Sequence, residues 1–254
     1  MKLNQILAAA LVAAASVPAM ASIGLPNTGN GELFLVVWDQ ADQVSYVKDL
    51  GIAQDSFDGS AALNFALDDA NFLGFLGVAN TTVSDLKFAV MAGDSAGTKR
   101  LFTTVDNAVT NLDNGRLTNS NAWMSTWANN QVTVSANTTH AGTAAVNGTS
   151  YDVSPNAAYF GASNGSTFQG QAVGWTNANL VGTEAVFRSF SSVGTGGGTA
   201  TLKSDFAGTW NVTQTAGAYS ATYSVAAVPE ADGILMALAG FGAIGFVARR
   251  RRLS

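Results

Sequence analysis

The chain has 254 residues, no cysteine and a single histidine, and its formal net charge is −5. The lack of cysteine excludes disulfide bonds and thiolate chemistry, and with the lone His140 it removes the usual zinc-ligand sets. Lysine and arginine cluster only at the C-terminal end, so the rest of the chain offers no basic patch for nucleic acid. Only 11% of the residues are charged, which suits an extracellular domain with polar, uncharged loops better than a cytosolic enzyme.

The first 21 residues have the three parts of a secretory signal peptide. Lys2 gives a positive start, residues 6–17 form an apolar run, and Pro18 ends that run. Ala19 and Ala21 place small residues where signal peptidase cleaves, so we expect a cut after Ala21. A Leu/Ala-rich core helix is the alternative, but it does not require these features in this order. We therefore predict export through the Sec translocon and processing by signal peptidase.

Residues 22–227 are the predicted exported domain, and strand patterns dominate them. Residues 31–47 are predicted to form a hairpin, because two segments rich in β-branched and aromatic residues flank a polar turn. Residues 86–91 and 100–105 are predicted to form a second hairpin around a turn at 93–97. This part of the chain carries fifteen acidic residues against seven basic ones, so we expect it to be acidic outside the cell.

Two short helices are predicted within this domain. Apolar residues recur at three- and four-residue spacing in residues 68–76, and Asp68 and Asp69 favour the positive end of that helix. Residues 119–130 contain two tryptophans one helical turn apart. These segments add helical cover to a fold that is otherwise built from strands.

After residue 131 the pattern is one of short strands between turns. Asn147-Gly148 is a strong two-residue turn signal, residues 191–199 read as a flexible Gly-rich loop, and residues 198–225 supply the closing strands. Many short strands must hide their edges, which favours closure. We therefore predict a mainly β fold: a single sandwich- or barrel-like domain with one or two short helices, followed by a C-terminal transmembrane helix.

Residues 228–254 combine a short motif, an apolar stretch and a basic end. Val228, Pro229 and Glu230 form the motif, and the sixteen residues 233–248 carry no charge. As a helix they rise about 24 Å, slightly less than the roughly 30 Å hydrocarbon core of a bilayer. The basic end is a run of four arginines: Arg249, Arg250, Arg251 and Arg252. By the positive-inside rule the arginines stay cytoplasmic and the preceding domain faces outward.

This three-part tail resembles the PEP-CTERM sorting domain over about the last tenth of the chain. The Pro-Glu pair of that family matches residues 229–230, its short apolar helix 233–248 and its arginine cluster 249–252, although Ala231 stands where most members have a second proline. The resemblance implies recognition by exosortase, a membrane-embedded processing enzyme of Gram-negative bacteria that also make exopolysaccharide. It further implies cleavage near the Pro-Glu pair, after a transient stay in the inner membrane.

Two other interpretations of the tail are a permanent membrane anchor and a buried core helix with a basic end. A helix this short and rich in glycine makes a poor permanent anchor, so the sorting interpretation is preferred. Under it, residues 228–254 are a signal to be removed and contribute nothing to the fold.

Two segments match the G-x-S-x-G pattern of a serine nucleophile, residues 93–97 and 161–165. The pattern requires a strand, a sharp turn and then a helix. A strand-like segment follows the first match and no helical pattern follows the second, so both are predicted to be turns. The chain order of Ser95, a following aspartate and His140 leaves a secreted serine hydrolase as an alternative.

Two acidic pairs, Asp39/Asp42 and Asp68/Asp69, offer oxygen ligands that suit Ca²⁺. Neither pair lies in a calcium-loop pattern, and roles in a turn and at a helix start explain both. We predict no metal or cofactor, with Ca²⁺ at these pairs as the alternative.

Tryptophan side chains stack on sugar rings where they are exposed, although core burial is the default for residues of this size. The chain has five of them: Trp38, Trp123, Trp127, Trp175 and Trp210. A polysaccharide-binding module that uses exposed Trp or Tyr is therefore an alternative function. The leading prediction is a non-enzymatic cell-surface or extracellular matrix protein, sorted by exosortase and associated with exopolysaccharide or biofilm.

Overall fold

The computed structural model of the chain describes residues 23–79, 85–105, 112–133, 148–162 and 176–225. Several predictions fall outside these residues: the signal peptide, the turn at Asn147, the serine at position 163 and the whole C-terminal sorting tail. They stay predictions.

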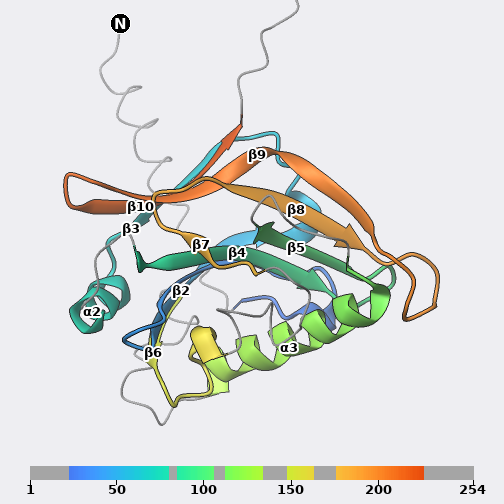
Figure 1. The fold of residues 1–254 in the computed structure, drawn as a ribbon, viewed down its shortest axis with the longest axis horizontal. Coiled ribbons are helices and arrows are strands. Elements are labelled where there is room, and N and C mark those ends of the chain that lie inside the picture. Colours follow the sequence, from blue (N-terminus) through green and yellow to red (C-terminus); the bar gives the residue numbers. More distant parts are fainter. Residues whose placement is uncertain (1–22, 80–84, 106–111, 134–147, 163–175, 226–254) are drawn as a thin grey trace, which may run out of the picture. The chain divides into compact units, whose positions relative to one another are not determined.

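Ten strands form one antiparallel sheet in the order β3-β10-β9-β8-β5-β4-β1-β2-β6, with β7 paired to β4 (Figure 1). Their bounds are β1 (Glu32–Asp39), β2 (Val44–Ala53), β3 (Leu63–Leu67), β4 (Lys87–Asp94), β5 (Arg100–Val105), β6 (Thr149–Val153), β7 (Asn179–Leu180), β8 (Ala185–Ser191), β9 (Leu202–Thr215) and β10 (Ala218–Val225). The helices are α2 (Ala70–Val78) and α3 (Asn114–Thr133), with 3₁₀ turns at Pro26–Thr28, Gln54–Ser56 and Phe160–Ala162.

The sheet curls into a half-barrel, so that β3, β10 and β9 lie across from β1, β2 and β6, and α3 runs along the outside of the second group (Figure 1). The mainly β prediction is confirmed. The two predicted hairpins are also confirmed as β1–β2 and β4–β5, and the predicted closing strands as β9 and β10. In the described residues, however, the sheet ends at β3 and β6 without a strand pairing between them.

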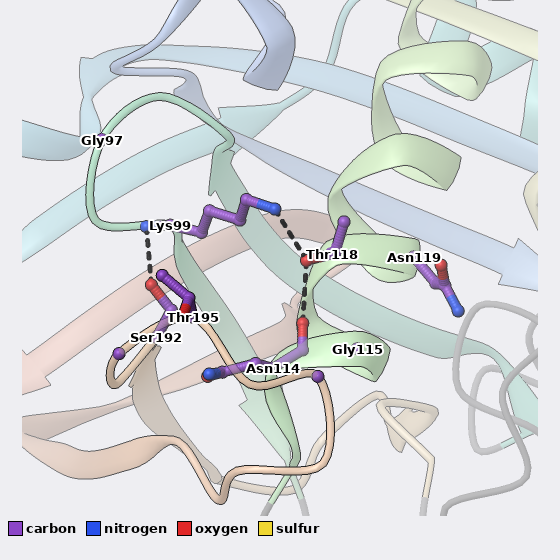
Figure 2. Close-up of a pocket in the computed structure, with 10 residues that line it drawn as sticks. Gly97, Lys99, Asn114, Gly115, Thr118, Asn119, Ser192 and Thr195 are labelled. Carbon is purple, nitrogen blue, oxygen red and sulfur yellow. Dashed lines mark hydrogen bonds between the residues drawn. The ribbon is translucent and has the colours of Figure 1, made fainter.

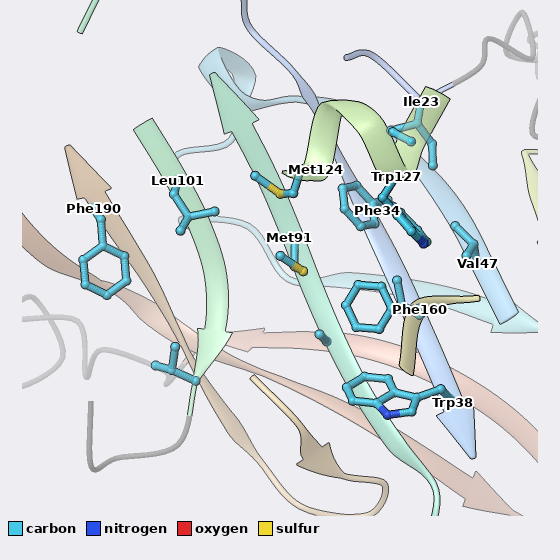
Figure 3. Packing of buried hydrophobic residues seen from close by; sticks show 14 of the residues in the cluster. Ile23, Phe34, Trp38, Val47, Met91, Leu101, Met124, Trp127, Phe160 and Phe190 are labelled. Carbon is cyan, nitrogen blue, oxygen red and sulfur yellow. The ribbon is translucent and has the colours of Figure 1, made fainter. Parts of the chain in front are cut away.

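One face of the sheet packs against α3, and side chains of β1 take part in that contact. The rings of Phe34 on β1 and Trp127 on α3 are 5.2 Å apart, and Trp38 and Met124 belong to the same buried cluster (Figure 3). The alternate residues of β1, which face the other way, are buried as well. A strand buried on both faces needs a continuous apolar run, which is the pattern that β1 shows.

The opposite face, inside the curl, is filled by aromatic side chains from strands far apart in sequence. Phe57 packs edge-on against Phe187 and Tyr223 at ring distances of 5.3 and 5.2 Å. Trp210 lies 5.4 Å from Tyr223 and is fully buried. Aromatic pairs of this kind add about 0.5–1.5 kcal/mol each beyond the area they bury. This second core stabilises the curvature of the sheet without any disulfide bond.

Helix α2 lies over the gap between the two ends of the half-barrel. Its Phe72 contacts Tyr46 of β2 at 4.9 Å and Tyr219 of β10 at 5.1 Å, so it joins both limbs of the sheet. Asp69 fixes the helix start: its carboxylate accepts the N–H groups of Asn71 and Phe72 at 3.0 and 3.1 Å. The helix predicted at 68–76 is therefore confirmed, with the predicted role for its acidic start.

Helix α3 begins at Asn114 and ends at Thr133, so it is longer than the predicted 119–130. Trp123 and Trp127 stack at 5.9 Å, as expected for residues one turn apart. In the described part of the chain, neither α3 nor any other helix is both long and apolar enough to cross a membrane. The transmembrane helix predicted at 233–248 lies outside that part.

Candidate functional site

The first G-x-S-x-G segment is the β4–β5 hairpin turn, as predicted. Both of its glycines have structural roles: a Cβ on Gly93 would lie 2.4 Å from Met124 Cε of α3, and Gly97 has a φ of +55°. Ser95 follows β4 and its backbone N–H donates to the carbonyl of Pro26 at 2.8 Å. Close packing and turn geometry thus account for the pattern without a nucleophile. His140, the base of the hydrolase alternative, lies outside the described residues.

Asp94 serves the same turn. Its carboxylate accepts the N–H of Ala96 and the guanidinium of Arg100, both at 2.8 Å. Burial alone raises the pKa of Asp94, but the hydrogen bonds from Arg100 and Ala96 outweigh it and lower the pKa below the ordinary value. This aspartate is therefore held ionised as a structural group.

The two acidic pairs proposed as Ca²⁺ ligands have the turn and helix-start roles that the sequence predicts. Asp39 accepts the N–H groups of Ala41 and Asp42 at 2.8 and 3.1 Å and so closes the β1–β2 turn. Asp69 caps α2. The residues with described placement hold no cluster of three or more metal-ligating His, Cys, Asp or Glu side chains.

The tryptophans do not form an exposed platform in the described residues. Trp38, Trp127 and Trp210 are at most 3% exposed, and Trp123 is half-buried against Trp127. Trp175 lies outside the described residues. The prediction of core burial is confirmed for the first three, and sugar binding by stacked tryptophan receives no support from them.

The described residues do contain a polar cavity of about 410 Å³ that sequence reasoning did not find (Figure 2). Three segments meet there: the β4–β5 turn, the start of α3 and the β8–β9 loop. The residues that line it are Gly97, Lys99, Asn114, Gly115, Thr118, Asn119, Ser192, Gly194, Thr195 and Gly197. Among these described residues there is one cation, Lys99, and no carboxylate. In a domain with a large excess of acidic residues, this is a local positive site.

Lys99 is held in place at both ends. Its ammonium donates to Thr118 Oγ1 at 2.9 Å, and that hydroxyl donates to the carbonyl of Asn114 at 2.8 Å (Figure 2). The backbone of Lys99 donates to Ser192 Oγ at 3.0 Å and accepts from Ser192 N–H at 2.9 Å. Within the described chain Lys99 forms no ion pair, so its charge is not neutralised by a neighbouring side chain.

The β8–β9 loop, which the sequence predicts to be flexible and rich in glycine, is hydrogen-bonded to the start of α3. Asn114 donates through Nδ2 to the carbonyls of Val193 and Gly196 at 2.8 and 2.9 Å, and Gly115 N–H donates to Gly197 O at 2.7 Å. The glycine content of the loop carries no information on a partner elsewhere in the chain, so sequence analysis did not find these hydrogen bonds. The loop forms one wall of the cavity.

In the sequence, no lysine stands beside the glycines of this loop, although the pattern of a phosphate-binding loop requires one. The structure supplies a lysine from a different hairpin, since Lys99 precedes the loop by almost a hundred residues. The pairing of β5 with β8 brings residues 99 and 192 together. Predicting that register from one sequence requires the sheet order, which no local pattern gives.

Comparison of the chain with protein-family models, with curated proteins and with solved structures gave no match. Functional inference therefore rests on the sequence signals at the two ends and on the geometry of residues 23–225.

Proposed function

We propose that this chain is an exported, non-enzymatic protein of the cell surface or extracellular matrix, sorted and processed by an exosortase. Residues 1–21 direct it to the Sec translocon, and residues 233–248 hold it briefly in the inner membrane as a transmembrane helix. Processing near Val228, Pro229 and Glu230 then releases the domain to the cell surface, where it is associated with exopolysaccharide.

The observation that carries this proposal is where the folded domain ends. Strand β10 ends at Val225, and the chain divides into compact units between Ser224 and Val225. The Pro-Glu pair begins four residues later, at Pro229. A sorting signal must be reachable by its enzyme without unfolding the domain, so its place directly after the last strand supports a processing role.

The proposal is tested by replacing Pro229 and Glu230 with alanine in the producing cells. The expected result is retention of the intact tail in the inner-membrane fraction, whereas the parent chain yields a mature C-terminus near residue 229 by mass spectrometry. A matched control is Ala231→Pro, which creates the commoner family motif and should be processed normally. Unchanged processing and release of the double-alanine variant would refute the sorting role.

The arginine cluster gives a second, independent test. Changing Arg249, Arg250, Arg251 and Arg252 to glutamine removes the charge that fixes the orientation of the tail. We expect the variant to be translocated past the membrane or left unprocessed, as seen by protease protection. Normal orientation and processing would contradict the transient-membrane step while leaving the domain's export untouched.

The hydrolase alternative is tested separately with a fluorophosphonate probe, which labels activated serines. Under the proposed non-enzymatic role the parent chain and Ser95→Ala give the same absence of labelling. Labelling that Ser95→Ala abolishes would establish a nucleophile in the β4–β5 turn and overturn that role.

A further inference from the structure

We propose that the cavity at Lys99 binds the carboxylate-bearing unit of an acidic saccharide, such as a uronic acid residue. The inference deepens the proposed function, because it names the class of ligand that a matrix protein would meet, but the site itself rests on geometry within residues 97–197.

The first step is the size of the cavity and the elements that form it. A volume of about 410 Å³ lies in the range of small-molecule sites and accommodates a sugar ring with its substituents. The walls come from two hairpins and a helix, which are fixed by strand pairing and by the hydrogen bonds of Asn114. A site built on fixed elements loses little entropy when a ligand enters it.

The second step is charge. The ammonium of Lys99 has three donors, and among the described residues Thr118 Oγ1 is its one partner. Two donors are thus left for an incoming group, and none of the described residues that line the cavity carries a carboxylate to compete for them. A single cation in a carboxylate-free cavity matches a ligand with one negative charge.

The third step is the neutral lining. The side chains of Asn119, Ser192 and Thr195 and the glycine backbone of the β8–β9 loop supply donors and acceptors for hydroxyl groups. Among the lining residues that the structure describes, none is aromatic or a large aliphatic residue. A hydroxyl-rich anion satisfies this lining, whereas an apolar or aromatic ligand finds no matching surface.

The fourth step separates a carboxylate from phosphate. Phosphate sites at helix starts use free backbone N–H groups. Here the N–H groups of Asn114, Gly115 and Arg116 already donate to Thr199 O, Gly197 O and Asp113 Oδ1. The carboxylate of Asp113 at the helix start is paired with the guanidinium of Arg116 at 3.5 Å. The site therefore offers one ammonium group, while the backbone N–H groups at the helix start are already occupied. This combination favours a monoanion over a phosphate dianion.

The test is calorimetric titration of the full chain in mild detergent with sodium D-glucuronate, D-glucose and inorganic phosphate. We expect millimolar glucuronate binding, with glucose and phosphate at least tenfold weaker, and a loss of affinity as salt is raised. Phosphate binding as tight as glucuronate binding would overturn the choice of carboxylate. Equal binding of glucose and glucuronate, or no glucuronate binding at all, would overturn the site.

Variants locate the binding. Lys99→Gln keeps a donor for Thr118 and removes the charge, so we expect glucuronate affinity to fall at least tenfold, while Lys99→Arg retains it within about threefold. The matched control is Lys203→Gln, an exposed lysine on β9 that does not line the cavity and should bind as the parent does. Equal affinity of Lys99→Gln and the parent at unchanged thermal stability refutes the assignment.

Failure of this inference is distinguishable from failure of the proposed function. The titration does not depend on C-terminal processing, and the Pro229 and Glu230 alanine variant should bind glucuronate normally. Normal binding with unchanged processing would remove the sorting role alone, whereas normal sorting without binding would remove the saccharide site alone.

Discussion

Asn114 and Val193 exchange two hydrogen bonds: the side-chain amide donates to the Val193 carbonyl at 2.8 Å, and the Val193 N–H donates to Asn114 Oδ1 at 3.1 Å. This pair fastens the β8–β9 loop to the first turn of α3. The residues are 79 positions apart in sequence, so the pair also closes a long-range contact of the fold.

Replacing the buried Asn114 with alanine should lower the free energy of unfolding by about 2 kcal/mol, because the carbonyls of Val193 and Gly196 and the N–H of Val193 lose their partner. Asn114→Asp should cost more, since a carboxylate would face the carbonyl groups of Val193 and Gly196. Urea unfolding followed by tryptophan fluorescence measures both. The exposed neighbour Asn119→Ala is the control, and a cost for it equal to that of Asn114→Ala would contradict the fastening role.

Asp69 should be the most sensitive acidic residue of the domain. It caps α2 and accepts hydrogen bonds from the Tyr46 hydroxyl at 2.6 Å and from Thr149 Oγ1 at 3.1 Å. Asp69→Ala removes the cap and leaves the buried Tyr46 hydroxyl without this partner, so we expect a loss of about 2–4 kcal/mol in thermal or urea unfolding. The adjacent, exposed Asp68→Ala should change stability by less than about 0.5 kcal/mol. Similar losses for both would show that charge, and not the cap, matters.

Two glycines should respond to alanine in opposite directions. A Cβ on Gly93 meets Met124 Cε at 2.4 Å and Asn121 Oδ1 at 2.8 Å, so Gly93→Ala should destabilise the fold by about 1–3 kcal/mol. Gly77 in α2 has open space around its Cβ position, and Gly77→Ala should stabilise the helix by about 0.5 kcal/mol. Calorimetric melting temperatures of the two variants decide the matter, and a stabilised Gly93→Ala would mean that α3 does not approach β4 so closely.

Asp49 should make the domain less stable as the pH rises towards neutrality. Burial raises its pKa from the ordinary 3.8 to about 6, against the opposing hydrogen bond from Gly51 N–H. A raised carboxyl pKa means that the folded state binds a proton more tightly, so this contribution is full below pH 3.8 and is lost as the pH passes 6.

Asp49→Asn removes that titration and keeps an acceptor for Gly51 N–H. We expect it to stabilise the domain by on the order of 1 kcal/mol at pH 7.5, a value reduced by partial exposure, and to have almost no effect near pH 4. Urea unfolding of variant and parent at several pH values gives the difference directly. A gain of the same size at pH 4 and pH 7.5 would exclude titration of Asp49 as its cause.

Local patterns predicted the elements whose determinants are local. The continuous apolar run at 33–38 and the polar turn after it gave the β1–β2 hairpin, and Asp69 before a three- and four-residue apolar spacing gave α2. The early start of α3 was missed because Gly115 argues against a helix. In the structure Asp113 accepts the N–H of Arg116 at 2.7 Å and Gly197 accepts that of Gly115, and these partners compensate for the glycine.

The candidate site could not be predicted by such patterns. Its lysine, its hydroxyl groups and its glycine loop come from segments near residues 99, 118 and 194, and each segment looks ordinary on its own. They come together only because β8 pairs with β5 and α3 crosses behind them. The function proposed for the two ends of the chain, in contrast, depends on contiguous residues, so a sequence pattern alone is enough to suggest it.

Strand β10 is hydrogen-bonded on both edges, to β3 and to β9, and it is the last element before the tail. Tension applied to the chain beyond Val225 enters the domain through this strand. Pulling it along its own axis shears two ladders at once, which is mechanically far stronger than peeling an edge strand one bond at a time. A load on the tail before it is processed would therefore be shared by β3 and β9.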